Sequence, residues 1–202
     1  MNREQRREGG YIILFACLAG FLVAGVCAGE GREGRSEFAL MGSSLGGVTR
    51  TFQGADITED DWLLYGLSIG WNATDHWNIN TDFSYGTIDF AGTKESYPVT
   101  GEQKTMLWML NADYNILTYP LTPFVTGGAG FGYTSVDATQ FSFGGGVIGQ
   151  TSETSSGFAY NVGVGGRWNI SYNVFFKVLY RIVWDSEGDQ REGFVVSLGW
   201  LF

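Results

Sequence analysis

GFVVSLGWLF, residues 193–202, is the stretch that decides the fold. Neighbouring side chains on a β-strand point to opposite faces, so every second residue of this segment shares a face. One face is entirely large and apolar, and the other is mostly small. The large face consists of Phe194, Val196, Leu198, Trp200 and Phe202. The pattern predicts a strand that presents one whole face to an apolar environment.

The same alternation recurs from Glu37 onward, in eight segments and with no helical repeat. In each clear segment, bulky apolar residues alternate with Gly, Ser, Asn and a few charged residues. The clear segments lie at 63–71, 77–85, 105–116, 158–170, 174–184 and 193–202. The first segment, Glu37 to Val48, and the fifth, Phe124 to Ser135, are rich in glycine, and their faces stay open.

Composition supports an all-β chain. The 202 residues include 31 Gly and only 3 Pro, with 16% aromatic residues. Aromatic residues favour strands, and a disordered chain does not carry this many of them. The length suits one domain with a sizeable core or one closed barrel.

The size of the apolar face decides which way it points. An eight-stranded barrel has an interior just wide enough for its own side chains, so the bulky aromatic set does not fit inside. The small and polar set fits the interior, and the aromatic set then faces lipid. The alternative is a soluble barrel of the lipocalin type, which would purify without detergent.

The expected connections alternate in length. Long connections fall at 49–61, 91–102 and 135–156, a medium one at 185–190, and short ones at 73–76, 117–121 and 171–173. Transmembrane barrels have short periplasmic turns and longer external loops, so this order predicts that both termini of the barrel lie in the periplasm. Aromatic residues near the strand ends are typical of interfacial girdles.

The first 28 residues are predicted to be a secretory signal peptide. Three Arg precede an apolar run from Tyr11 to Val26, and cleavage is expected after Ala28. The alternatives are a retained anchor, for which the run is shorter than the roughly 20 apolar residues required, and lipid attachment at Cys27. Both cysteines lie in this leader. Residues 29–36 would form a short linker before a barrel at 37–202, and the mature chain would carry 9 basic and 19 acidic residues, a net charge of −10.

Three segments carry a family resemblance: FVTGGAGFGY (124–133), GFAYNVGVGGRW (157–168) and VFFKVLYRIVW (174–184). They resemble the fifth, sixth and seventh strands of the small eight-stranded outer membrane barrels that include the OmpA transmembrane domain, OmpX and the opacity proteins. The resemblance implies a closed up-and-down antiparallel barrel in the outer membrane of a Gram-negative bacterium. The alternating ending with its terminal Phe also resembles the C-terminal signal that the outer membrane insertion machinery reads.

Five charged residues are expected to point into the barrel lumen. They are Asp82, Asp113, Arg167, Lys177 and Arg181. Buried charges need partners, so we expect cross-lumen ion pairs in two tiers, with Asp113, Arg167 and Lys177 nearer the periplasm and Asp82 and Arg181 further up. The alternative is that these side chains line a hydrated channel unpaired.

No catalytic, cofactor or metal site is predicted. The only histidine, His76, falls in an expected periplasmic turn, and a mature chain without cysteine has no thiol nucleophile. The segment GGGVIG (144–149) fits a nucleotide-binding pattern but no helix follows it, so we interpret it as a chance match. The acidic runs TEDDW (58–62) and DSEGDQ (185–190) suit either solvated loops or divalent cations shared with lipopolysaccharide.

The predicted function is that of a structural or surface-interaction protein acting through its external loops, with the lumen largely plugged by side chains. Its partners would be outer membrane lipid, lipopolysaccharide, the insertion machinery and an extracellular ligand of unknown kind, with the chain a monomer. The acidic charge disfavours nucleic acid and heparin-like partners. The alternatives are a narrow OmpW-like channel for small or hydrophobic solutes and a lipid A-modifying enzyme.

Overall fold

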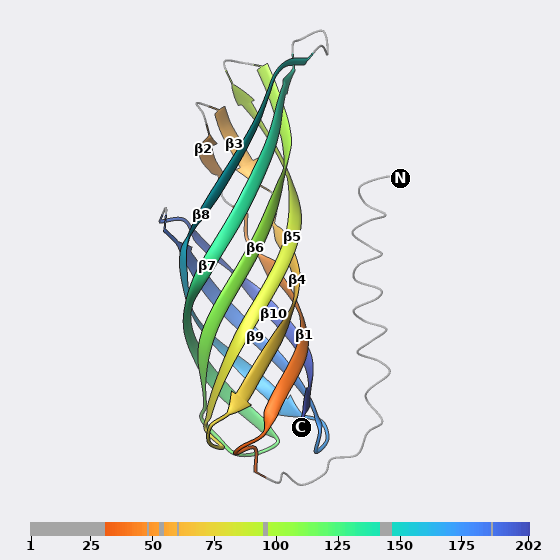
Figure 1. Ribbon diagram of the computed structural model, residues 1–202, viewed down its shortest axis with the longest axis vertical. Coiled ribbons are helices and arrows are strands. Elements are labelled where there is room, and N and C mark those ends of the chain that lie inside the picture. Colours follow the sequence, from red (N-terminus) through yellow and green to blue (C-terminus); the bar gives the residue numbers. More distant parts are fainter. Residues whose placement is uncertain are drawn as a thin grey trace.

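The computed structural model describes residues 31–47, 49–52, 55–59, 61–94, 97–141, 147–186 and 188–202. Ten antiparallel strands lie in these residues, arranged as a tall barrel that extends further on one side (Figure 1). No helix among them is long and apolar enough to cross a membrane. The strands are β1 (Ser36–Leu45), β2 (Thr49–Phe52), β3 (Ala55–Glu59), β4 (Trp62–Asn72), β5 (Trp77–Lys94), β6 (Tyr97–Asn115), β7 (Leu121–Phe141), β8 (Val147–Asn169), β9 (Val174–Asp185) and β10 (Gln190–Leu201).

Eight of these strands close the barrel, which confirms the predicted fold. β1 pairs with β4 on one side and with β10 on the other, and the remaining pairs follow the chain from β4 to β10. The β1–β10 register runs from Glu37 opposite Leu201 to Leu45 opposite Gly193. The last strand therefore leaves no open edge along the barrel wall at this seam.

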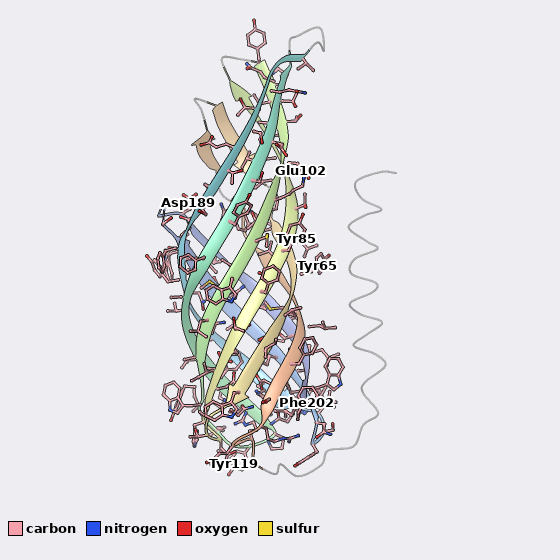
Figure 2. The ribbon with its side chains drawn as sticks, in the orientation of Figure 1. Tyr65, Tyr85, Glu102, Tyr119, Asp189 and Phe202 are labelled. Carbon is pink, nitrogen blue, oxygen red and sulfur yellow. The ribbon has the colours of Figure 1, made fainter. Side chains whose placement is uncertain are left out.

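The bulky apolar side chains face outward, as predicted. Tyr65 on β4 is 61% exposed, and Phe158, Val162 and Val164 on β8 are similarly exposed. Figure 2 shows Tyr65 and Tyr85 on the outside of the barrel wall, with Phe202 near its lower end. The outward assignment of Ile170 is wrong: it is buried, because β8 ends at Asn169 and the alternation ends with it.

The structure also assigns the two glycine-rich strands that the sequence leaves open. On β1, Glu37, Ala39 and Met41 are buried in the lumen. On β7, Phe124 is buried in the lumen whereas Phe131 is exposed outside. The lumen thus contains bulky residues in addition to the small and polar set.

A close approach of backbones explains why small residues dominate the interior. A Cβ at Gly165 on β8 would lie 2.4 Å from the carbonyl oxygen of Val178 and 2.7 Å from Cζ of Phe124. Both distances are shorter than a real Cβ contact, so only glycine fits beside the inward ring of Phe124. The neighbouring Gly166 has open space at the same position.

The prediction of long irregular loops at 91–102 and 135–156 is wrong. β5 continues to Lys94 and β6 begins at Tyr97. In the same way, β7 continues to Phe141 and β8 begins at Val147. The predicted loop 49–61 contains β2 and β3, and β3 pairs with β5. These extensions pair their own backbone groups and bury a second small cluster of Phe90, Val99, Val136 and Ala138. We call β2, β3 and residues 87–94, 97–104, 135–141 and 147–158 the protruding sheet (Figure 1).

Candidate functional site

The lower lumen holds a cluster of buried charges centred on Glu37. Arg167 Nη1 donates to Glu37 Oε2 at 2.7 Å, and Lys177 Nζ donates to Glu37 Oε1 at 2.8 Å. Lys177 Nζ also donates to Asp113 Oδ2 at 3.2 Å. The Phe175 ring lies against these cations, 4.2 Å from the Arg167 guanidinium carbon. Two cations and two carboxylates therefore meet in one largely buried cluster.

Glu37 is the member that the sequence reasoning missed. It is the second residue of β1, and its facing was left open because that segment is rich in glycine. A usable signal was present, because the five predicted lumen charges did not balance: three cations accompanied two carboxylates. A third inward carboxylate was needed near Arg167 and Lys177.

A ladder of amides lies above this cluster and leads to the second ion pair. Asn161 Nδ2 donates to Asn111 Oδ1 at 2.8 Å, and Asn111 Nδ2 donates to Asn80 Oδ1 at 3.0 Å and to Asp82 Oδ2 at 2.9 Å. Arg181 Nη1 lies 3.5 Å from Asp82 Oδ2. A cavity of about 30 Å³ lies among these residues, enough for about two water molecules.

A hydrophobic layer crosses the lumen above the amides. Leu64 and Met109 are fully buried in it, and no member is more than 8% exposed. Along β6 the inward residues change from Asn111 to Met109 and Leu107 and back to Thr105. The hydrophobic layer consists of Leu45, Trp62, Leu64, Ile88, Leu107, Met109, Ala159 and Val183.

A second cavity of about 70 Å³ opens above the hydrophobic layer, at the outer mouth. Its floor includes Leu107 and Val183, and its walls carry Gln103 and several hydroxyl groups. Arg191 packs over Trp62 at the side of this cavity, with its guanidinium carbon 3.8 Å from the ring centre. Apolar side chains of the hydrophobic layer therefore lie between the two cavities.

The periplasmic mouth is crossed by the residues that precede β1. Arg32 is buried and donates to Asn115 Oδ1 at 3.2 Å, to the carbonyl of Asp75 at 2.7 Å and to that of Leu117 at 3.1 Å. Burial, followed by the nearby charge of Arg167, lowers the pKa of Arg32 to about 10, so it stays charged at neutral pH. This segment was predicted to be a simple linker, and it closes the lower end of the lumen.

Several predicted features carry no further chemistry in the structure. His76 lies in the β4–β5 turn, with Nδ1 2.7 Å from the carbonyl oxygen of Asn115. Among the described residues no group of three or more His, Cys, Asp or Glu side chains is placed to hold a metal ion. Residues 1–30, Asp60, Glu187 and part of GGGVIG (144–149) lie outside the described residues, so the signal peptide and the cation site stay predictions.

The C-terminal residues continue the outward apolar face of β10. Phe194 and Phe202 are exposed, and the backbone N–H of Phe202 donates to the carbonyl of Ser36 at 2.9 Å. Val196, Leu198 and Trp200 lie on the same face and are partly exposed. Their role as an insertion signal stays a prediction.

Comparison with known proteins settles the family. The sequence model described as the outer membrane protein beta-barrel domain matches residues 14–202. The chain belongs to this family. It is an integral β-barrel protein of the Gram-negative outer membrane, as the sequence predicts. A search of curated proteins finds no match.

Solved structures agree on the fold. The chain is similar to Ail, the attachment invasion locus protein of Yersinia pestis, with a TM-score of 0.57 and 16% identity over 84% of this chain and 99% of Ail. It is similar to Neisserial surface protein A, with a TM-score of 0.53 and 14% identity over 83% and 94% of the two chains. It is also similar to OprG from Pseudomonas aeruginosa, with a TM-score of 0.53 and 14% identity over 85% and 97%. At these identities the likeness shows the fold alone.

Proposed function

We propose that this protein is a sealed barrel that presents the protruding sheet to molecules outside the cell. The observation that carries the proposal is the hydrophobic layer, which separates a cavity of about 30 Å³ from one of about 70 Å³. An ion crossing this layer would lose its hydration without gaining polar partners, which is strongly unfavourable. The barrel then anchors the protruding sheet in the membrane. Its ion pairs Asp82–Arg181 and Asp113–Lys177 connect strands across the lumen and help to fill it.

The alternative is a narrow channel for small or hydrophobic solutes. It requires a continuous path, and the tightly packed Leu64 and Met109 oppose one. An enzymatic role is disfavoured as well. His76, the single histidine, lies at the periplasmic end of the barrel. Lipid A chemistry would take place at the opposite end, near the outer mouth. We therefore propose a non-enzymatic monomer that contacts lipopolysaccharide around its rim and uses the insertion machinery for assembly.

Similar proteins suggest surface contacts but not the same ligand. Ail has been crystallised with the heparin analogue sucrose octasulfate. The predicted external segments of this chain carry eleven Asp and Glu against Arg50 and Lys94, so a polyanion would be repelled. We propose an extracellular ligand that is positively charged or neutral.

Conductance of the refolded protein in a planar lipid bilayer tests the sealed lumen. We expect no conductance from the wild type or from Asp82→Ala, because the hydrophobic layer remains in both. The Leu64→Ser, Met109→Ser double variant is expected to conduct, because hydroxyl groups would hydrate the layer. Steady conductance in the wild type would overturn the proposal in favour of a channel.

The protruding sheet is tested by shortening it. Deletion of residues 137–152 with an Asn-Gly turn joining Val136 to Glu153 keeps their strand pairing and leaves the barrel intact. Bacteria producing the full protein are expected to be retained on glass coated with basic proteins, and bacteria producing the shortened protein are not. The heat-dependent shift in gel mobility verifies that both proteins are folded. Equal retention of the two folded proteins would refute a surface role for this sheet.

A further inference from the structure

The cavity of about 70 Å³ at the outer mouth, which we call the outer pocket, has an apolar bottom and polar walls. Its floor belongs to the hydrophobic layer and includes Leu107 and Val183. Along the inward face of β6, Leu107 is followed toward the outside by Thr105 and Gln103, so the wall becomes polar above the floor. Figure 2 shows Asp189, another lining residue, beside the outer ends of β9 and β10.

Glycine on two neighbouring strands makes the hollow. Leu107 lies opposite Gly132 on β7, and Gly132 lies opposite Gly157 on β8. A Cβ built on Gly132 would meet only Cδ1 of Leu107, at 4.0 Å, so among the described residues no side chain fills this place. The position beside Gly157 is taken by the hydroxyl group of Ser186, from the turn between β9 and β10. The hollow therefore lies at Gly132, next to the apolar floor.

A row of hydroxyl groups lies just outside the glycines. Thr105 on β6 lies opposite Thr134 on β7, and Thr134 lies opposite Ser155 on β8. The hydroxyl oxygens of Thr105 and Thr134 are 3.5 Å apart, and Gln103 Nε2 donates to Thr105 Oγ1 at 3.3 Å. Gln103 and Thr105 are almost completely buried. Hydroxyl and amide groups both donate and accept hydrogen bonds, so this wall suits a ligand group that does both.

The charged residues of the outer pocket favour a neutral ligand. Arg191 packs over Trp62 on one side, and its Nη2 lies 4.0 Å from Asp189 Oδ2. Asp185 is a second carboxylate in the lining. One cation between two carboxylates opposes an ammonium group, and the two carboxylates together with the net charge of −9 oppose an anion. A carboxylate accepts several hydrogen bonds, so the rim suits neutral hydroxyl donors.

The volume limits the group that can enter. One water molecule needs about 10–15 Å³, so the outer pocket holds about five water molecules or a ligand group of about five non-hydrogen atoms. An acetamido group is of this size, with a methyl end that matches the apolar floor and an amide that matches the hydroxyl row. A whole sugar ring is larger, so a ring attached to this group would stay at the rim.

We propose that the outer pocket binds a neutral sugar with an N-acetylated amino group, holding the acetamido group inside and the ring at the rim. This inference rests on the proposed sealed barrel and names a ligand class for its outer end. The acetyl methyl group lies on the floor, in the hollow at Gly132. The amide binds the hydroxyl groups of Thr105 and Thr134, and the ring hydroxyl groups donate to the carboxylates of Asp185 and Asp189.

Saturation-transfer NMR tests the ligand class. The protein is refolded in a zwitterionic detergent without sugar or amide groups, and the probes are the methyl glycosides of N-acetylglucosamine, glucose and glucosamine. We expect saturation of the N-acetylglucosamine probe alone, strongest at its acetyl methyl group because that group is the most deeply buried. Absence of this signal, or equal binding of either other probe, would overturn the inference. Stronger saturation of the ring than of the methyl group would do so as well.

A matched pair of glycine variants locates the site. Gly132→Val puts a side chain into the hollow and should abolish binding of the N-acetylglucosamine probe. Gly166→Val adds the same side chain on β8, where a Cβ also meets nothing within 4 Å, and should leave binding unchanged. The heat-dependent shift in gel mobility verifies that both variants are folded. If folded Gly132→Val protein binds the probe as well as the wild type does, the ligand lies elsewhere and the inference fails.

A matched pair of threonine variants keeps the inference testable if Gly132→Val does not fold. Thr134→Val preserves the shape of the side chain and removes its hydroxyl group, so it should weaken probe binding about fivefold, the loss of one hydrogen bond. Thr126→Val makes the same change on β7 at the lower cavity, beyond the hydrophobic layer, and should have no effect. Equal affinities for the wild type and Thr134→Val would refute contact with the hydroxyl row.

Two sources could supply such a sugar, and a second arm of the experiment distinguishes them. Probe binding is compared in phospholipid vesicles with and without lipopolysaccharide from the producing bacterium. Weaker binding in its presence would identify the bacterium's own surface sugars as the occupant. Unchanged binding would identify an external glycan. Either result supports the site.

These outcomes are separable from those that test the proposed function. A silent bilayer without sugar binding would remove the ligand and leave the sealed barrel. Conductance of the wild type together with sugar binding would refute the sealed lumen and leave the ligand.

Discussion

Replacing Glu37 by Gln should destabilise the folded barrel more than any other single change in the lumen charges. Glu37 is 3% exposed and accepts from both Arg167 and Lys177. Gln keeps the volume of the side chain, removes the charge and replaces one of the two acceptor oxygens by an NH2 donor. The lower cluster would then contain two cations and one carboxylate, Asp113.

The expected loss in the free energy of unfolding depends on which partners each cation retains in the variant. Lys177 retains the Asp113 carboxylate at 3.2 Å, whereas Arg167, fully buried, loses its carboxylate partner and keeps only neutral acceptors, Asn169 at 3.0 Å among them. One uncompensated buried charge costs about 3–5 kcal/mol. In Asp113→Asn, by contrast, Lys177 keeps Glu37, so the loss is about 1.5–3 kcal/mol, the contribution of one charged hydrogen bond.

Equilibrium unfolding in urea measures both values. The protein would be refolded into phosphatidylcholine vesicles and followed by tryptophan fluorescence. The Glu37→Gln, Arg167→Met double variant removes both charges and should be less destabilised than Glu37→Gln alone. A loss below about 1 kcal/mol for Glu37→Gln, or one smaller than that of Asp113→Asn, would show that the cluster is hydrated and would refute the reasoning.

Three further changes probe other parts of the molecule. Gly165→Ala should destabilise the barrel by about 1–3 kcal/mol, because the new Cβ meets Phe124 and the Val178 carbonyl; Gly166→Ala, which has open space, should not, and equal unfolding midpoints would contradict the packing. Arg32→Ala removes three hydrogen bonds across the periplasmic mouth and should speed amide hydrogen exchange in the turn 115–118. The control Arg35→Ala should leave exchange in that turn unchanged. Equal exchange in the wild type and Arg32→Ala would count against closure of the mouth by this segment. Phe202→Ser should slow assembly by the insertion machinery in vitro without changing unaided folding into detergent. A matched Tyr119→Ser change at the same end should leave the assembly rate unchanged. An unchanged assembly rate for Phe202→Ser would contradict its role as a signal.

The barrel itself could be predicted because its signal is local. Strands such as β4 and β8 alternate a lipid-facing apolar residue with a small or polar one, so each residue reports its own facing. The closure of β1 on β10 followed from the apolar ending at Phe202. The five predicted lumen charges lie in the lumen for the same reason.

The lumen contents were harder to predict because they depend on contacts between strands far apart in sequence. Glu37 contacts Arg167 across 130 residues. Glycine on β1 and β7 removes the alternation that would have revealed the facing of Glu37 and Phe124. The hydrophobic layer was missed for a related reason: Leu64 and Met109 stand singly on the predicted polar faces of their strands, and the layer forms only when the strands are brought together.

The protruding sheet was mistaken for loops because its two faces are both largely polar. Ser, Thr and Gly in 135–156 are as common in loops as in exposed strands, and no apolar face marks the difference. A weaker signal was present in Phe90, Val99, Val136 and Ala138, which continue the inward alternation of β5, β6 and β7 beyond the hydrophobic layer. These four residues are the apolar anchor for the strands outside the barrel.

The layered interior separates the stability of the barrel from that of the protruding sheet. Below the hydrophobic layer, buried ion pairs and amides tie opposite walls together, so this part opens only if several buried charges lose partners at once. Above it, the described apolar contacts of the sheet reduce to the small cluster around Phe90 and Val136. The sheet can therefore move without a change in the hydrophobic layer that contains Leu64 and Met109. A surface for binding and a sealed membrane wall coexist in one continuous set of strands because the hydrophobic layer lies between them.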